Sequence, residues 1–378
     1  MKQIMIKPEI QSYDTFREFA AEYVLGEQDV ILTNEYIYDP IMAAEHLKCG
    51  VIYQEKYGAG EPTDVMTEAI LKEVGKYDAK RVIAVGGGTI IDIAKVLVLD
   101  GGGDIDDMYR NMAALKKRRE LIIVPTTCGT GSEVTNIAVL NRTKLGTKQG
   151  MVSAAMFADK AVLIPEFLGS LPYKVFATSS IDALVHAVES YLNPAATVFS
   201  EMYSVRAVEM LLEGYCKIAQ KGTEAWKEDA ESYLIASNMA GIAFSNNGCG
   251  AVHAMAYAIG GKYHVPHGES NYQFFIPVLK LYEEKVSGGK VGELKNILKS
   301  CMTKGRFCRE DCGESAIDLL KELLNKVLPA KRMSEYGVVQ EDIVPFAQST
   351  VENQQRLLKN SHVPLSRDEI QAVYQGCL

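Results

Sequence analysis

Four side chains between residues 182 and 267 are of the types that bind divalent metal ions. Asp182 and His186 lie four residues apart in a segment with helical periodicity, so both project from one face about a turn apart. His253 and His267 bracket a charge-poor segment that ends in residues 263–268, Tyr-His-Val-Pro-His-Gly. One carboxylate and three imidazoles suit Fe(II), Zn(II) or Mn(II) better than Ca(II) or Mg(II). The set predicts one metal site; a helix cap at Asp182 and ordinary core histidines are the alternative.

A glycine-rich loop in the first half of the chain predicts phosphate binding. The loop consists of Gly86, Gly87, Gly88 and Thr89. It follows a β-rich run, and residues 90–95 after it have the pattern of a helix. Glycines let the backbone approach a phosphate closely, and the helix start supplies free N–H groups. Thr89 and Asp92 would also suit a plain N-terminal cap. The loop lacks the GxGxxG fingerprint, which disfavours an ordinary Rossmann dehydrogenase.

A second loop, residues 126–133, follows the next apolar run and is dense in hydroxyls and glycines. Its hydroxyl groups belong to Thr126, Thr127, Thr130 and Ser132. A loop that faces phosphate or ribose would have this composition, whereas a capping box of Thr130 and Glu133 would explain it without a ligand. Two such loops at the ends of successive strands favour a nucleotide site.

The elements that carry the loops alternate between β-rich runs and helix-like stretches as far as about residue 175. Continuous apolar runs of this length, separated by amphipathic segments, indicate a parallel sheet buried on both faces. The predicted strands are residues 30–33, 51–53, 82–85, 121–124, 137–140 and 161–164.

From about residue 173, helical periodicity replaces the strand pattern. The predicted helices are residues 174–192, 199–219, 224–244, 250–260 and 315–328. We therefore expect an α/β domain over residues 1–175 and an all-helical domain over residues 176–378, with the active site in the cleft between them.

Composition narrows the class of protein. The chain has 378 residues, 47% hydrophobic and 23% charged, with a net charge of −8, which argues against nucleic acid or an anionic membrane as the main partner. The charge-free stretch 232–261 reaches membrane length, but its asparagines, glycines and histidine suit two buried helices joined by a turn. Eight cysteines without an export signal suggest reduced thiols, so we expect a soluble cytoplasmic protein.

At this point the motifs together resemble the iron-dependent (group III) alcohol dehydrogenases. The glycine loop with Asp92 and Lys95 is similar to the dinucleotide loop of that family, and residues 126–133 resemble its second loop. The metal signature also matches residue by residue, including the fourteen-residue spacing from His253 to His267. The resemblance covers nearly the whole chain. It implies a dinucleotide-binding α/β domain and an all-α metal-binding domain, the architecture shared with dehydroquinate synthase.

The resemblance also implies cofactors and partners. It predicts one divalent metal, Fe²⁺ or else Zn²⁺, and NAD, with NADP as the alternative. Lys148 is a further candidate contact with the cofactor. The expected partners are a small-molecule substrate and further copies of the chain, in a homodimer or a larger homo-oligomer.

Three runs, residues 54–62, 261–269 and 354–358, resemble members of the family that act on an ω-hydroxy acid. They imply interconversion of 4-hydroxybutyrate and succinate semialdehyde; a general short-chain alcohol or diol dehydrogenase is the alternative. The carboxylate of such a substrate needs a donor or a cation, and Lys262 and His264 are candidates because they lie close in sequence to the metal ligands.

Two departures from the family pattern affect the predicted site. Tyr257 stands where many members have a second histidine, so proton relay would use Tyr257, His264 or water. Asn34 stands where an acidic residue commonly meets the adenosine ribose, which weakens the expected preference for NAD over NADP.

Two other functions compete with this prediction. A lyase of the dehydroquinate synthase type acts on a phosphorylated substrate and should carry a cluster of Lys and Arg near the metal. Residues 182–186 and 232–261 contain none. A non-catalytic nucleotide sensor would have no reason to keep all four metal ligands.

Overall fold

The computed structural model describes residues 4–378, which divide into two compact units. The α/β unit comprises Ile6–Leu171, and the helical unit comprises Pro172–Leu378 together with residues 4 and 5. No helix within residues 4–378 is both long and apolar enough to cross a membrane.

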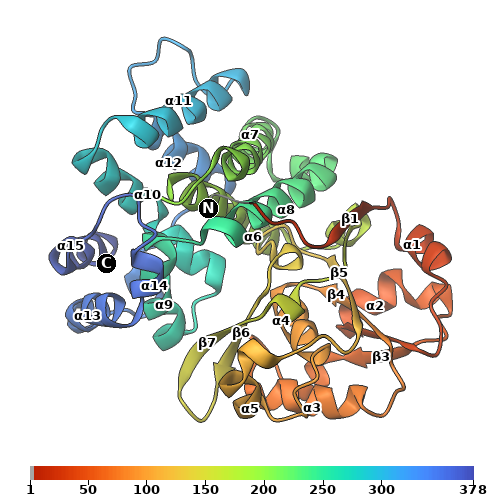
Figure 1. The fold of residues 1–378 in the computed structure, drawn as a ribbon. Coiled ribbons are helices and arrows are strands. Elements are labelled where there is room, and N and C mark those ends of the chain that lie inside the picture. Colours follow the sequence, from red (N-terminus) through yellow and green to blue (C-terminus); the bar gives the residue numbers. More distant parts are fainter. Residues whose placement is uncertain (1–3) are drawn as a thin grey trace. The chain divides into compact units, whose positions relative to one another are not determined.

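A six-stranded sheet forms the centre of the α/β unit (Figure 1). Its strand order is β1-β8-β5-β4-β2-β3, and all neighbouring strands are parallel. The strands are β1 (Glu9–Ser12), β2 (Asp29–Thr33), β3 (Gly50–Tyr53), β4 (Arg81–Gly86), β5 (Glu120–Pro125) and β8 (Lys160–Leu163). The predicted α/β class is confirmed. Strand β1 was not predicted, because this largely exposed edge strand offers no continuous apolar run.

Both faces of the sheet are covered, because successive side chains of a strand point to opposite sides. Ile31 of β2 packs with Phe16 and Phe19 of the first helix, whereas Leu32 packs on the other face with Ile91 of the helix after β4. The helices of this unit are α1 (Phe16–Tyr23), α2 (Glu35–Ile41), α3 (Asp64–Val74), α4 (Gly88–Leu97) and α5 (Ile105–Arg110).

One predicted strand belongs elsewhere. Residues 137–140 were expected in the parallel sheet, but they form β6 (Ile137–Arg142), which pairs antiparallel with β7 (Thr147–Val152) in a separate two-stranded sheet. The alternation of buried and half-buried residues along β6 fits a strand that is covered on one face only. The prediction was wrong because a short apolar run does not reveal its pairing partner.

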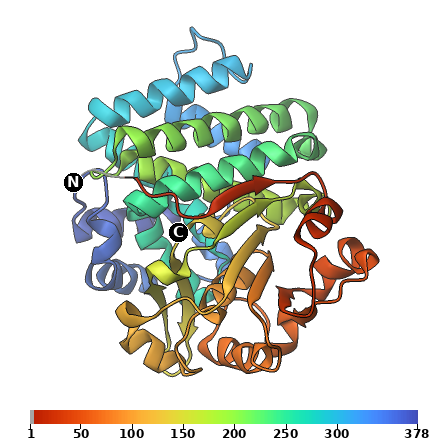
Figure 2. The same ribbon diagram turned by 45° about the vertical axis from the view of Figure 1, so that its right-hand side comes forward.

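Ten α-helices, three 3₁₀ helices and no strand make up the described part of the helical unit, as the periodicity from residue 173 predicted, although the start of the predicted helix 224–244 is the 3₁₀ helix Thr223–Asp229. In Figure 2, α11, α7 and α8 lie side by side in successive layers. The helices are α6 (Tyr173–Leu192), α7 (Val198–Lys221), α8 (Ala230–Asn247), α9 (Ala251–Tyr263), α10 (His267–Lys285), α11 (Gly289–Lys304), α12 (Ala316–Val327), α13 (Ile343–Asn353), α14 (Gln355–Leu358) and α15 (Arg367–Cys377).

The charge-free stretch forms α8 and α9, as predicted, with a turn between them. Gly248 has a φ of +85°, a conformation that side-chain-bearing residues rarely adopt. Asn193, after the end of α6, donates from Nδ2 to the carbonyl oxygen of Asn247 at 2.6 Å. The turn therefore brings the start of α9 back against α6.

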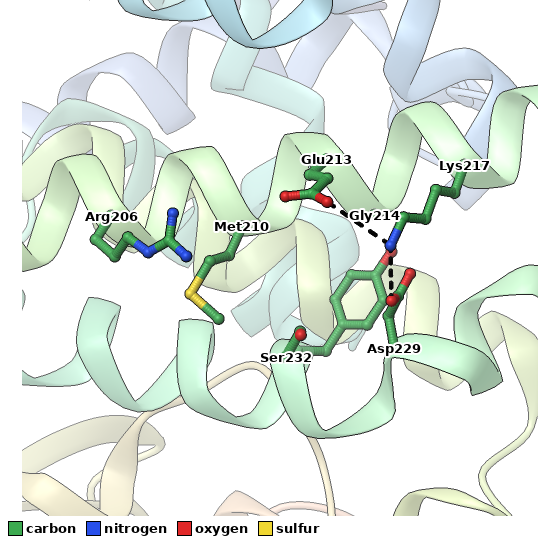
Figure 3. A pocket seen from close by; sticks show the side chains of 8 residues that line it. Arg206, Met210, Glu213, Gly214, Lys217, Asp229 and Ser232 are labelled. Carbon is green, nitrogen blue, oxygen red and sulfur yellow. Dashed lines mark hydrogen bonds and ion pairs between the residues drawn. The ribbon is translucent and has the colours of Figure 1, made fainter. Parts of the chain in front are cut away.

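A small pocket of about 60 Å³ lies between α7 and α8, and Figure 3 shows the side chains that line it. Its floor depends on Gly214, because a Cβ atom at this position would lie 2.2 Å from the hydroxyl oxygen of Tyr233. Tyr233 is buried, and its ring packs edge-on against Phe176 of α6. The close approach of α7 to α8 therefore requires glycine here.

We expect Gly214→Ala to lower the free energy of unfolding by about 1–3 kcal/mol, because the buried tyrosine ring has no room to move. Gly261→Ala is the matched control: a Cβ there meets nothing within 4 Å, and alanine favours a helix by up to about 1 kcal/mol. Urea denaturation measures both. Equal stability of the two variants would contradict the claim that glycine is required between α7 and α8.

Candidate metal centre and dinucleotide loops

Three helices bring the four predicted metal ligands together. Asp182 and His186 lie one turn apart on α6, His253 lies in the first turn of α9, and His267 is the first residue of α10. One carboxylate oxygen and one nitrogen from each imidazole all lie within 4.8 Å of one another. Residues far apart in sequence thus converge on a space that can hold one divalent cation.

The centre is rich in lone pairs and poor in protons. Nε2 of His186 and Nε2 of His253 are 3.0 Å apart. Asn271 of α10 places its single amide nitrogen 2.7 Å from Asp182 Oδ1, 3.0 Å from His253 Nε2 and 3.2 Å from His267 Nε2. Three acceptors share one donor group, while the buried Oδ1 of Asn271 has no hydrogen-bond partner within residues 4–378. This donor set fits a cation, which would satisfy all the lone pairs at once.

The protonation states of His186 and Asp182 suit ligation. By contrast, burial of His253 is outweighed by Cys249 and Glu189, which raise its pKa, so this imidazole would lose a proton on binding a metal. Burial lowers the pKa of His186 to about 4, so its imidazole is neutral at physiological pH and can ligate without first losing a proton. Burial opposes ionisation of Asp182, but the surrounding imidazoles and the Asn271 amide outweigh it and hold the pKa of this carboxyl below its usual range.

Glu189 orients one of the imidazoles. It lies one turn after His186 on α6, is buried, and its Oε2 is 2.6 Å from Nδ1 of His253. Oε1 accepts a bond from the backbone N–H of Val252 at 2.7 Å, which fixes the carboxylate in place. A carboxylate accepts only, so Nδ1 carries the proton and Nε2 of His253 faces the centre with its lone pair.

Apolar side chains border the centre. The ring of Phe244, on α8, stacks on that of His186 with 4.4 Å between centroids. Cys249 is buried beside Glu189 and His253, and burial raises the pKa of its thiol. Phe244 also packs in one cluster with Cys249, Ala254 and Leu357. Asp182, His186 and His253 are therefore buried, whereas His267 is exposed and leaves one side of the centre open to solvent.

In the α/β unit, the glycine loop follows β4 and opens α4. Gly87 is the N-cap of α4, and no side chain caps the helix. The predicted capping alternative is wrong, because Thr89 donates instead to the carbonyl oxygen of Gly60 at 3.2 Å. A Cβ at Gly88 would lie 3.2 Å from Cγ2 of Thr130 in the second loop. The loop is therefore a bare backbone cradle over free N–H groups, which fits a phosphate.

The second loop lies directly against the first. The N–H of Thr126 donates to the carbonyl oxygen of Gly86 at 3.1 Å, and the methyl group of Thr127 faces Gly87. Gly131 is the N-cap of the short 3₁₀ turn that follows and makes no side-chain cap bond, so the predicted capping box of Thr130 and Glu133 does not form.

Asp92 and Lys95 hold this second loop rather than facing outward. Asp92 accepts from the Ser132 hydroxyl at 2.8 Å and from the N–H of Val139 at 2.9 Å. Lys95 is fully buried; its Nζ donates to Ser132 Oγ at 2.5 Å and to Thr135 Oγ1 at 2.8 Å. The predicted cofactor contacts of Asp92 and Ser132 remain predictions, and the bonds observed here fix the loop to α4.

Two other predicted cofactor residues, Asn34 and Lys148, already have side-chain partners. Asn34 is the N-cap of α2 and donates from Nδ2 to Gln54 Oε1 at 3.1 Å and Glu55 Oε2 at 2.8 Å. Lys148, on β7, pairs with Glu61 at 2.6 Å, so its charge is already compensated.

The predicted catalytic residues are spread along α9. Tyr257 lies one turn after His253 and packs in the cluster that includes Phe244. Lys262 forms an ion pair with Asp342, and His264 is the C-cap of α9 with a φ of +53°. At 1.5 Å per residue, Lys262 and His264 lie about 13 Å and 16 Å along the helix from His253, whereas Tyr257 lies about 6 Å away.

Sequence reasoning missed Glu189 and Asn271. The helical spacing could have indicated both, because residues three or four apart lie on one face of a helix. Glu189 follows His186 by three residues, and Asn271 follows His267 by four. Their partners on other helices could not be read from that spacing.

Comparison with known proteins places the chain in a family. A model of the iron-containing alcohol dehydrogenases matches residues 13–165, and a model of the C-terminal part of the Fe-containing alcohol dehydrogenase family matches residues 176–378. The chain belongs to the iron-containing alcohol dehydrogenase family. It is 46% identical to 4-hydroxybutyrate dehydrogenase of Clostridium kluyveri over 99% of both chains. It is also 32% identical to sulfoacetaldehyde reductase of Bilophila wadsworthia, over 88% of this chain and 86% of that one.

Solved structures share the fold. A sulfoacetaldehyde reductase from Bifidobacterium kashiwanohense in complex with NAD⁺ matches with a TM-score of 0.84, covering 100% of this chain and 98% of that chain at 20% identity. A 1,3-propanediol oxidoreductase matches with a TM-score of 0.83 over 100% of both chains, also at 20% identity.

We expect Glu189→Gln to weaken metal binding about 10–100-fold, because an amide cannot hold the His253 tautomer as a carboxylate does. Competition with a chromogenic chelator for Zn²⁺ measures the affinity of the purified protein. The matched control is Glu201→Gln, which removes a carboxylate that pairs with Lys290 away from the centre. Unchanged affinity in the Glu189 variant would contradict the orienting role.

Proposed function

We propose that the protein is a metal-dependent oxidoreductase that interconverts 4-hydroxybutyrate and succinate semialdehyde with NAD(H). The observation that supports metal-dependent chemistry is the convergence of four ligands on one point, which suits a divalent cation. These ligands are Asp182, His186, His253 and His267. The 46% identity to a 4-hydroxybutyrate dehydrogenase over nearly the full length supports the substrate. The names of two relatives, that dehydrogenase and the sulfoacetaldehyde reductase, both indicate a short substrate with an anionic end.

The metal is Fe²⁺ or Zn²⁺, held by the four convergent side chains. A bound divalent cation supplies Lewis-acid polarisation of the substrate oxygen, which favours hydride addition to the aldehyde and alkoxide formation from the alcohol. Glu189 and Asn271 keep the ligand side chains in place. Phe244 and the buried cluster around Leu357 cover the His186 and His253 side of the centre, and the exposed His267 marks the side from which a substrate would enter.

Gly87 and Gly88, at the bare start of α4, would hold the pyrophosphate of the dinucleotide, which would supply or accept the hydride when bound. Thr126, Thr127 and Thr130 line the same cradle. Asp92 and Lys95 act through the loop by holding it against α4.

Tyr257 is the proton-relay residue that we favour over His264. It projects from the face of α9 that carries His253 one turn earlier, whereas His264 is the C-cap of α9, three residues before the ligand His267. Water can replace Tyr257 in this role.

Arg356 is the partner that we propose for the substrate carboxylate. Its neighbour Leu357 packs with Cys249 and Ala254 at the start of α9, which puts α14 level with the metal ligands. Within residues 4–378 the guanidinium of Arg356 makes no ion pair or hydrogen bond, whereas Lys262 is bound to Asp342. A free guanidinium suits a carboxylate, which it can bind through two hydrogen bonds.

The chain assembles as a homodimer or a larger homo-oligomer, as the family resemblance implies. Size-exclusion chromatography with light scattering measures this state directly.

We expect protein reconstituted with Fe(II) or Zn(II) in the absence of oxygen to oxidise NADH much faster with succinate semialdehyde than with butanal. The anionic end of the substrate gains binding energy that butanal lacks. Removal of the metal with a chelator should abolish both activities, and fresh metal should restore them. Equal or faster turnover of butanal would instead assign the protein to the general short-chain alcohol dehydrogenases.

We expect Arg356→Gln to raise KM for succinate semialdehyde at least tenfold and to leave KM for butanal within twofold. Loss of the guanidinium removes a charged hydrogen bond that only the carboxylate substrate makes. Lys262→Gln serves as the comparison and should change neither value by more than threefold. Equal effects of Arg356→Gln on both aldehydes would remove Arg356 from this role.

A further inference from the structure

The edge of the sheet that carries the glycine loop also carries an acidic group. The register pairs Leu32 of β2 with Ala84 of β4, and Thr33 of β2 with Tyr53 of β3. Continued along each strand, this register puts Gly86, Asn34 and Gln54 in one row at the carboxyl ends of three neighbouring strands. Neighbouring strands lie about 4.8 Å apart, so the residues after β3 are about 10 Å from the glycine loop.

Asn34 cannot act there as a free amide. Both bonds that its Nδ2 makes go to oxygen acceptors, Gln54 Oε1 at 3.1 Å and Glu55 Oε2 at 2.8 Å. A carboxylate only accepts, so the orientation of the Asn34 amide is determined and its donors are used. Asn34 is buried, which leaves its side chain little freedom to turn toward a ligand.

Glu55 is held in this position from two sides. Besides the Asn34 amide, the backbone N–H of Glu35 donates to Glu55 Oε1 at 2.6 Å. Glu55 is nevertheless exposed, and each carboxylate oxygen has a second lone pair to offer. The chain thus carries a fixed, solvent-facing carboxylate beside the position where a dinucleotide fold commonly has an acid that binds the adenosine ribose.

We propose that Glu55, from the neighbouring strand β3, takes the place of the missing acidic residue at Asn34 and selects NAD(H) over NADP(H). This inference rests on the proposed dinucleotide site. The carboxylate accepts a hydrogen bond from the ribose 2′-hydroxyl of NAD(H) and repels the 2′-phosphate of NADP(H). The weakened NAD preference expected from Asn34 alone is thereby restored.

Nearby cations do not offset this repulsion. Lys148 is paired with Glu61. Lys56, the residue after Glu55, extends over the ring of Tyr53 with its Nζ 4.6 Å from the centroid. The carboxylate of Glu35 adds a further negative charge next to Asn34.

Titration of NADH and NADPH fluorescence with the whole protein gives the two dissociation constants without any need for turnover. We expect the wild-type protein to bind NADH at least 30-fold more tightly than NADPH. Glu55→Gln should weaken the binding of NADH severalfold and strengthen the binding of NADPH at least tenfold. The two dissociation constants should then lie within about threefold of each other. The matched control, Asp39→Asn, removes an exposed carboxylate of α2 and should leave the wild-type ratio unchanged.

The outcomes separate this inference from the proposed function. Failure of the wild-type protein to bind either dinucleotide would overturn the proposed function itself. Binding of NADH with an unchanged ratio in Glu55→Gln, or a wild-type preference for NADPH, would overturn the role of Glu55 and leave the dehydrogenase standing. The wild-type ratio alone tests the inference if the variant does not fold.

Discussion

The structure of the helical unit depends on bringing the lone pairs of four side chains together at one point, three of them buried and one exposed. Asp182 and three imidazoles from α6, α9 and α10 lie within 4.8 Å of one another, and the Asn271 amide nitrogen lies within hydrogen-bond distance of three of these four side chains. Buried acceptors without donors destabilise a fold unless a cation joins them. The turn at Gly248, the bond from Asn193 and the Glu189 carboxylate all keep the start of α9 against α6. We regard the bundle as the support of one metal centre.

In the α/β unit, the glycine loop has no side chains that could fix its shape. The second loop packs against it, and Lys95 and Asp92 bind that second loop to α4. Replacement of Asp92 would leave the fully buried Lys95 without its carboxylate partner, which is costly in any fold. These two residues of the glycine-loop motif thus have a structural explanation that spacing alone did not provide.

The sequence predicted the fold class and the composition of the centre because both depend on short-range patterns. Apolar runs identified the strands of the sheet core, and the four-residue spacing of Asp182 and His186 placed them on one helix face. The sequence did not predict the pairing of β6 with β7 or the hydrogen bonds of Glu189, Asn271 and Glu55. These depend on contacts between segments that lie far apart in the chain. Nearness in sequence was also misleading for Lys262, whose charge is compensated by Asp342 far along the chain.

The most direct test of the metal centre is an anomalous-scattering map from crystals grown with Fe(II) or Zn(II), collected on both sides of the absorption edge of the metal. We predict a single peak per chain, within about 2.0–2.3 Å of one oxygen of Asp182 and one nitrogen each of His186, His253 and His267. A map without a peak among these four side chains, or with its main peak elsewhere, would contradict the account.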